Sequence, residues 1–303
     1  MKSDKLPEQT STDGEEKPTS KVYQIGTSWT GFSALRYLFI FGDSYSDVGY
    51  TTFRTRVTPS AAQPLGMEFP GMTFNEEGLP NWVGHLISKY CPPPRFNPSL
   101  KPQEQDKQYM QSPILVYDYA IGGQTVDGVR FQIENYFLPH LGTNPPEATW
   151  NASNSIFITW VGINDCGRYA DGHMAIKELI AAQEKLYHAG ARNFLFIDVP
   201  PIHRSPAIPK REEESSSSIY RNWNATLGEA LEEFSKSHED MSIFMFSSFE
   251  VFENVLNKPQ DYGIKEKEVR KTGGAIWVDH LHPTSKMHDI LASFLADFLG
   301  KIE

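Results

Sequence analysis

Five short, almost continuously apolar segments constrain the fold of this chain more than any other feature of its sequence. They comprise residues 37–41, 114–119, 155–161, 193–198 and 241–246, and they are rich in β-branched and aromatic side chains. A strand with one solvated face alternates apolar and polar residues, whereas a strand covered on both faces is apolar throughout. The five segments therefore predict a parallel sheet with helices on both sides.

Helical patterns separate these segments. The clearest covers residues 174–188, where apolar residues recur at steps of three and four and Gly190 follows as a stop signal. Further helices are predicted over residues 82–90, 126–137, 219–234 and 290–299. Strand–helix alternation of this kind favours one α/β domain with right-handed crossovers. Two long polar or proline-rich connections, residues 91–113 and 200–218, are predicted to be solvated loops.

The composition fits one globular domain, since 39% of the 303 residues are hydrophobic. The net charge is −10 and no Lys/Arg-rich run occurs, which disfavours nucleic-acid and anionic-membrane partners. No apolar segment approaches the roughly 20 residues that span a bilayer. Residues 1–21 are predicted to be a disordered tail and residues 22–303 the single domain. The tail lacks the apolar run of a signal peptide, so the sequence as written predicts a cytoplasmic protein.

Polar or glycine-rich clusters follow the first three predicted strands, and another precedes the last predicted helix. They are Gly42-Asp43-Ser44, Gly122-Gly123-Gln124, Asn164-Asp165, and Asp279 with His280 and His282. The carboxyl ends of parallel strands meet at one edge of a sheet, where functional groups gather. Each cluster alone is compatible with a turn or a helix cap. Together they contain every part that an ester-cleaving site requires.

Ester hydrolysis needs a nucleophile, a base, a group that orients the base, and donors for the developing oxyanion. Ser44 is the candidate nucleophile, His282 the base and Asp279 the orienting carboxylate. The backbone N–H groups of Ser44 and Gly123 and the side-chain amide of Asn164 are the candidate oxyanion donors. Loss of one such donor typically costs about 3 kcal/mol of transition-state stabilisation.

Other chemistries find less support in the sequence. Cys91 and Cys166 are far apart and no His or Cys pair has zinc-ligand spacing, so no metal is predicted. The glycine-rich motifs of nucleotide sites are absent, and no organic cofactor is predicted. Asp43 is interpreted as a hydrogen-bond brace and, with Trp82, as a possible member of the substrate pocket. For Trp82 the alternative is a position in the core.

In these clusters the sequence resembles the GDSL or SGNH hydrolase family, named for its Ser, Gly, Asn and His. The motifs FGDSYSDVG, YAIGGQTVDG, VGIND and DHLHPT stand in the family's order and at similar spacing. The resemblance implies a flavodoxin-like three-layer α/β/α sandwich with a five-stranded parallel sheet. The family's Asp-x-x-His spacing favours His282 over His280 as the base. In the family, the glycine whose N–H binds the oxyanion stands just before a polar residue and Thr. Gly123 has this position, so the pattern favours Gly123 over Gly122 as the donor.

Longer stretches resemble the fungal branch that includes acetyl esterases of carbohydrate esterase family sixteen. These are SWTGFSALRYLFIFGDSYSDVG, PLGMEFPGMTFNEEGLPNWVGHL and YDYAIGGQTVD. Members of that branch, which are usually secreted, remove acetyl groups from small acetylated sugars and xylo-oligosaccharides. The resemblance implies a serine esterase acting on short acyl esters of small carbohydrates or metabolites through an acyl-enzyme. Acyl transfer by the same residues and a catalytically silent binding module are alternatives, and the oligomeric state stays open.

Overall fold

A six-stranded sheet forms the centre of the computed structural model, which describes residues 18–51, 57–143, 145–146, 148–168 and 171–302. Its strands are β1 (Lys21–Gln24), β2 (Tyr37–Gly42), β3 (Leu115–Asp118), β4 (Ser155–Trp160), β5 (Asn193–Ile197) and β6 (Ser242–Phe246). They are ordered β1-β6-β5-β4-β2-β3 across the sheet. Strands β2 to β6 run parallel, and β1 runs antiparallel to β6. The predicted α/β class and the five parallel strands are confirmed.

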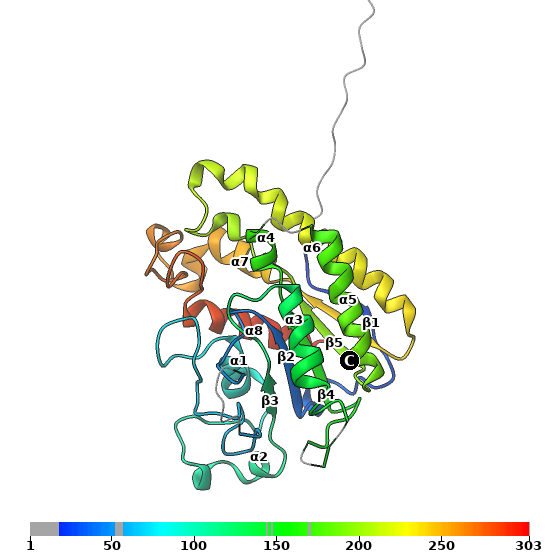
Figure 1. Ribbon diagram of the computed structural model, residues 1–303. Coiled ribbons are helices and arrows are strands. Elements are labelled where there is room, and N and C mark those ends of the chain that lie inside the picture. Colours follow the sequence, from blue (N-terminus) through cyan, green and yellow to red (C-terminus); the bar gives the residue numbers. More distant parts are fainter. Residues whose placement is uncertain (1–17, 52–56, 144, 147, 169–170, 303) are drawn as a thin grey trace, which may run out of the picture.

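Helices cover both faces of this sheet (Figure 1). They are α1 (Trp82–His85), α2 (Lys107–Gln111), α3 (Val126–Gln132), α4 (Ile163–Gly167), α5 (Gly172–His188), α6 (Glu213–Ser237), α7 (Ser248–Asn257) and α8 (Ser285–Gly300). Helices α3, α5 and α6 pack side by side over one face, and α1 packs against α8 over the other. The predicted helices 82–90 and 126–137 end in π-helical turns at Leu86–Tyr90 and Ile133–Phe137. Short 3₁₀ helices lie at Phe32–Ala34, Pro102–Glu104, Ile202–Arg204, Lys210–Glu212, Pro259–Tyr262 and Glu266–Glu268.

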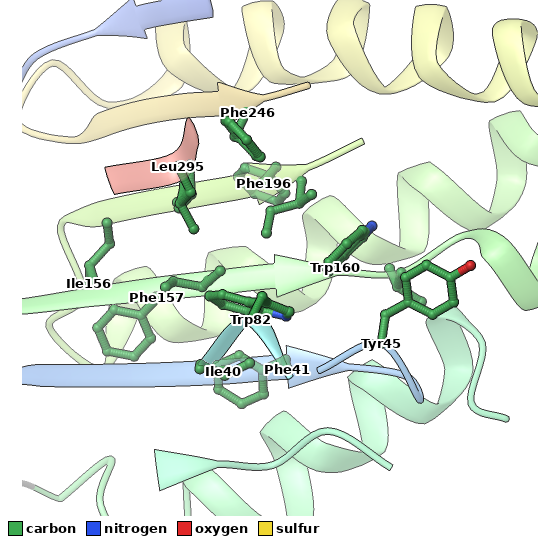
Figure 2. Close-up of a cluster of buried hydrophobic side chains, with 14 of the residues drawn as sticks. Ile40, Phe41, Tyr45, Trp82, Ile156, Phe157, Trp160, Phe196, Phe246 and Leu295 are labelled. Atoms are coloured by element: carbon green, nitrogen blue, oxygen red, sulfur yellow. The ribbon is translucent and has the colours of Figure 1, made fainter. Parts of the chain in front are cut away.

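Burial of the sheet on both faces explains why its strands are apolar throughout. Phe39 of β2 stacks on Phe157 of β4 with ring centroids 4.8 Å apart, and its edge meets Trp150 at 5.5 Å. The next residue, Ile40, belongs to the cluster of buried side chains that includes Leu295 of α8 (Figure 2). Successive side chains of a strand point to opposite faces, so both faces need apolar residues.

Strand β1 was not predicted, although only its first residue, Lys21, falls within the predicted tail. Lys21 already pairs with Met245 of β6, and the Ser20 hydroxyl accepts a hydrogen bond from the backbone N–H of Ser247 at 3.0 Å. This four-residue strand lies at the edge of the sheet and carries no apolar run. Its pairing depends on a strand far away in the chain, which a local pattern does not reveal. Residues 1–17 of the predicted tail lie outside the described residues.

The predicted loop 200–218 is also partly wrong, because α6 begins at Glu213. Glu213 and Glu214 occupy the first turn, where carboxylates interact favourably with the helix dipole, and Glu213 pairs with Arg270 at 2.7 Å. The Ser217 hydroxyl donates a hydrogen bond to the Glu214 carbonyl at 2.8 Å. Serine runs suggest loops because serine competes for backbone hydrogen bonds, but here that local bond forms within the helix. The loop 91–113 likewise contains α2.

Two further observations bear on the class of protein. Cys91 and Cys166 are both buried as free thiols, so they do not pair with each other. Within the described residues, every helix is too short or too polar to cross a bilayer.

Candidate active site

Ser44 lies just beyond the end of β2, at the carboxyl edge of the sheet. Gly42 ends the strand with φ +153°, and a Cβ built on it would lie 2.1 Å from the carbonyl oxygen of Trp160 in β4. Only glycine therefore lets the chain turn this close to its neighbour. Ser44 is 6% exposed, and its Oγ lies 3.0 Å from Nε2 of His282. The structure thus brings together the predicted nucleophile and the predicted base.

Asp279 holds the other side of the His282 ring. Its Oδ2 lies 2.7 Å from Nδ1 of His282, while its Oδ1 accepts the backbone N–H groups of Leu281 and His282, each at 2.7 Å. Burial acts to raise the pKa of Asp279, but the hydrogen bonds from the His282 ring and from the two N–H groups outweigh it and lower the pKa. The carboxylate is therefore ionised at neutral pH and accepts a hydrogen bond from the imidazole.

The loop that carries His282 is fixed by its neighbours. The His282 carbonyl accepts a hydrogen bond from Val278 N–H at 2.9 Å. The hydroxyl of Tyr45, the residue after the predicted nucleophile, donates to the Leu281 carbonyl at 2.7 Å. This buried tyrosine links the loop that follows β2 to the loop that precedes α8. The position of His282 relative to Ser44 is therefore set by direct contacts between the two loops.

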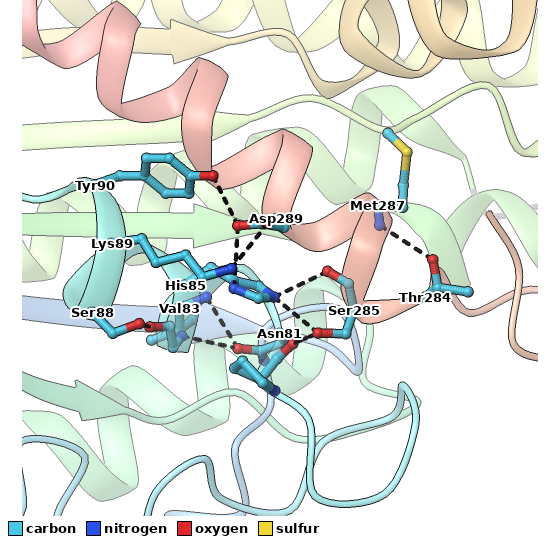
Figure 3. Close-up of polar contacts among 12 residues, drawn as sticks. Asn81, Val83, His85, Ser88, Lys89, Tyr90, Thr284, Ser285, Met287 and Asp289 are labelled. Carbon is cyan, nitrogen blue, oxygen red and sulfur yellow. Dashed lines mark hydrogen bonds and ion pairs between the residues drawn. The ribbon is translucent and has the colours of Figure 1, made fainter. Parts of the chain in front are cut away.

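The start of α8, three residues after His282, is held in place by several hydrogen bonds (Figure 3). Thr284 caps the helix, and its hydroxyl accepts the N–H of Met287 at 3.2 Å. Nε2 of the buried His85 lies 2.9 Å from the hydroxyl of Ser285. The backbone N–H of Ser285 donates to the Glu76 carboxylate at 2.6 Å. These contacts limit the freedom of the preceding loop.

Of the predicted oxyanion donors, Ser44 and Gly123 lie on the loops after β2 and β3, and Asn164 lies in α4, which follows β4. Gly123 has φ +77°, and its carbonyl accepts a hydrogen bond from Arg168 at 3.0 Å. Within the described residues, the N–H groups of Ser44 and Gly123 make no hydrogen bond. Nδ2 of Asn164 donates to the Gln124 carbonyl at 2.9 Å and to Asp43 Oδ2 at a longer 3.3 Å. A substrate oxygen would compete only with the longer of these two contacts.

Asp47, which the sequence analysis did not select, joins two of these loops. Its Oδ1 accepts the N–H of Gly49 at 2.6 Å, and its Oδ2 accepts the N–H of Gly122 at 2.8 Å. The backbone N–H of Gly122 is therefore already hydrogen-bonded to Asp47, whereas within the described residues the N–H of Gly123 makes no hydrogen bond. The only sequence signal was the position of Asp47 three residues after Ser44, and that spacing does not distinguish a carboxylate that joins two loops from one in a turn.

Asp43 is fully buried, so it does not line an open pocket as predicted. Its Oδ1 accepts the N–H of Tyr45 at 3.1 Å, as expected of a hydrogen-bond brace. Burial raises its pKa to about 7, and the carboxylates of Asp165 and Asp47 contribute to that shift. Asp165, considered above only as part of the Asn164 cluster, accepts the N–H of Val126 at 3.2 Å and so serves the first turn of α3.

Trp82 is likewise in the core rather than at the pocket. Its side chain is 1% exposed, packs near Trp160 with ring centroids 6.3 Å apart, and donates to the Ser46 hydroxyl at 3.2 Å. Phe74 does pack on the predicted base, since its ring stacks on His282 with centroids 5.2 Å apart. Phe74 sits in a long irregular connection, within the stretch PLGMEFPGMTFNEEGLPNWVGHL that carries part of the resemblance, but nothing in that stretch singled out this residue. His280, the rejected alternative base, is exposed.

Within the described residues, no group of three or more His, Cys, Asp or Glu side chains is arranged to hold a metal ion. The site consists of a hydroxyl, an imidazole, a carboxylate and free backbone donors. This combination is suited to acyl transfer through a covalent intermediate.

Known proteins that are similar to this chain include esterases and acylhydrolases. The family described as GDSL-like Lipase/Acylhydrolase matches residues 38–295. A protein named Acetylesterase from Thermothelomyces thermophilus is 30% identical over 288 residues, covering 86% of this chain and 87% of the relative. GDSL esterase/lipase 5 from Arabidopsis thaliana is 22% identical over 286 residues, covering 82% of this chain and 72% of the relative.

A solved structure shares the fold. Axe2, an acetylxylan esterase from Geobacillus stearothermophilus, superimposes with a TM-score of 0.52 at 16% identity, covering 88% of this chain and 95% of that one. The family match spans most of the chain, including the segments that carry Ser44, Gly123, Asn164 and His282. The chain therefore belongs to the GDSL-like lipase/acylhydrolase family and is a carboxylic ester hydrolase.

Proposed function

We propose that the protein hydrolyses short acyl esters, above all acetyl esters, of small carbohydrates or metabolites. The observation that carries this proposal is the continuous contact from Ser44 Oγ through the His282 ring to Asp279, at 3.0 and 2.7 Å. The acetyl preference draws support from the names of the similar proteins, an acetylesterase and an acetylxylan esterase.

In the first half of the proposed reaction, Ser44 Oγ attacks the ester carbonyl carbon while His282 Nε2 accepts the hydroxyl proton. The carboxylate of Asp279 stabilises the imidazolium that forms. The carbonyl oxygen becomes an oxyanion and accepts hydrogen bonds from the N–H groups of Ser44 and Gly123 and from the Asn164 amide. Each of these donors gains most when the charge on the oxygen is greatest, which is at the transition state.

In the second half, the imidazolium returns its proton to the leaving alcohol and the C–O bond to that alcohol breaks. The acyl group is then esterified to Ser44. Water attacks this acyl-enzyme, His282 accepts the water's proton, and the carboxylic acid leaves as the proton returns to Ser44 Oγ. The proposed cycle uses these side chains and water, and it needs no metal or organic cofactor.

Covalent labelling tests the nucleophile directly. A serine-directed fluorophosphonate should modify the wild type once, and Ser44→Ala should abolish both labelling and ester hydrolysis. Ser60→Ala is the matched control, because Ser60 is exposed in a surface turn and should label as the wild type does. A folded wild-type protein that resists the reagent would contradict the proposal.

A substrate panel tests the acyl and alcohol preferences. The panel contains p-nitrophenyl esters of increasing chain length, followed by acetylated xylo-oligosaccharides and other acetylated metabolites. The expected result is release of acetate, with kcat/KM falling as the acyl chain lengthens. Reactions that include an acceptor alcohol separate hydrolysis from acyl transfer, because a dominant acylated acceptor would overturn the assignment as a hydrolase.

A further inference from the structure

The side chain of Phe74 lies between His282, the proposed base, and the loop of Gly122 and Gly123, which we call the oxyanion loop. Its ring stacks on the His282 ring at 5.2 Å with an interplanar angle of 30°. The far edge of the ring reaches Gly122, since a Cβ built on that glycine would lie 2.2 Å from Cζ of Phe74 and 2.7 Å from Cε2. The Phe74 side chain therefore contacts both His282 and the oxyanion loop, and the absence of a side chain at Gly122 leaves room for the ring.

The loop that carries this ring is fixed at several points. Asn75, which is 8% exposed, donates through Nδ2 to the Leu79 carbonyl at 2.8 Å. The N–H of Met72 donates to the Val48 carbonyl at 2.8 Å, which joins the loop to the segment after Ser44. Glu76 binds the first residue of α8. Phe74 is 43% exposed, but the residues that flank it are held by these bonds, and its ring is restrained by contact with His282 and Gly122.

The position of the ring indicates which part of the ester it meets. The leaving alcohol must lie at Nε2, on the edge of the imidazole that faces Ser44. Phe74 covers a face of the imidazole instead, and it extends to the glycine that precedes Gly123. An ester whose carbonyl oxygen is bound by the N–H of Gly123 would therefore have its carbonyl carbon beside this ring, and the acyl chain extends from that carbon.

We propose that Phe74 is a specificity-determining residue that limits the length of the acyl group. This inference rests on the proposed esterase function and gives it a physical basis. A methyl group fits beside the ring, whereas a longer chain meets an aromatic wall anchored by its loop. Overpacking against a fixed wall is unfavourable, because the chain or the ring must leave its preferred position.

The test compares kcat/KM for p-nitrophenyl acetate, butyrate and hexanoate in the wild type and in Phe74→Ala. Burying one methylene group favours binding about fourfold. Opening the wall should therefore raise the hexanoate-to-acetate ratio by about tenfold or more, even if the space accommodates only two of the four added methylene groups. Phe74→Trp should act in the opposite direction and lower the butyrate-to-acetate ratio.

Phe131→Ala is the matched control. Phe131 is 51% exposed on α3 and its ring contacts Tyr136, so this variant should keep the wild-type profile. An unchanged hexanoate-to-acetate ratio in an active Phe74→Ala enzyme would overturn the inference. A uniform loss at every chain length would also overturn it, because the ring would then serve to position His282. A wild type that cleaves no acetate ester would refute the proposed function itself, which keeps the two failures apart.

Discussion

Replacing Asp279 by Asn should place the wrong tautomer of His282 in the site. In the wild type, Asp279 Oδ1 accepts the N–H groups of Leu281 and His282 at 2.7 Å each, and Oδ2 faces Nδ1 of the imidazole. An asparagine has one oxygen, and the two backbone donors require it at the Oδ1 position. Its NH₂ group then faces Nδ1, which must become an acceptor, and Nε2 keeps the proton. A protonated Nε2 cannot accept the proton of Ser44.

The backbone contacts set the size of the effect. To restore the active tautomer, the amide must flip and present NH₂ to two backbone N–H groups. This loses two hydrogen bonds of about 1 kcal/mol each, and up to about 3 kcal/mol each where the donors are left buried and unsatisfied. The active tautomer is therefore disfavoured by about 2–6 kcal/mol. Since 1.4 kcal/mol corresponds to tenfold in rate, kcat should fall by about 30-fold to 10⁴-fold.

The assay is steady-state hydrolysis of p-nitrophenyl acetate, with kcat and KM determined separately. We expect the loss in kcat, because Asp279 touches the imidazole and not the substrate. The thermal unfolding midpoint should change little, since the amide oxygen keeps both backbone hydrogen bonds. Asp261→Asn, the same change at an exposed position, is the control. A variant that retains more than a third of kcat would refute this reasoning, as would one that loses activity only through unfolding.

Three further predictions concern buried residues. Asp47→Asn replaces one of the two carboxylate acceptors by a donor and so weakens the link to Gly122. The value of kcat should fall about 10- to 100-fold, while KM should stay within about twofold of the wild type. If the rate of fluorophosphonate labelling and the folded fraction fell equally, a positioning role would be contradicted. Trp82→Ala should lower the free energy of unfolding, measured in urea, by about 3–5 kcal/mol, because the side chain is buried. A changed KM with unchanged stability would instead show that Trp82 contacts the substrate. Burial raises the pKa of Asp198 from 3.8 to about 7, so its stabilising contribution is complete below 3.8 and is lost as the pH rises through 7. Urea unfolding at pH 5 and pH 8 should show a smaller pH dependence for Asp198→Asn than for the wild type, and equal slopes would rule out this linkage.

Those parts of the fold with a strong local signal were predicted from the sequence. Residues 37–41 are apolar throughout because helices cover both faces of β2, so burial itself produces the pattern. The helix at 174–188 was recognised from its period, and the structure extends it to the Asp171 cap. Strand β1 was missed because four half-exposed residues pair only with the distant β6. The start of α6 was missed because its first turns are stabilised by acidic and serine side chains rather than by an apolar face.

The roles in the candidate site were predictable where chemistry restricts the residue type. Serine after the first predicted strand, with histidine and a carboxylate just before the last predicted helix, has few other joint uses, and the structure places Ser44, His282 and Asp279 in direct contact. The surroundings of these groups were less predictable. An exposed aromatic and a buried one look alike in sequence, so Trp82 stayed open between the pocket and the core, whereas the structure buries Trp82 and stacks Phe74 on His282.

The sequence by itself determined the alternation of strands and helices and the identity of the reactive groups, because both are written in residue types and their local spacing. Only the tertiary structure decided how these groups are supported. Asp47 bridges the loops after β2 and β3, Tyr45 fixes the loop before α8, and Phe74 spans from His282 to Gly122. Each of these contacts joins residues far apart in the chain. Their distance and direction depend on how the whole sheet and its helices pack, which no local pattern contains.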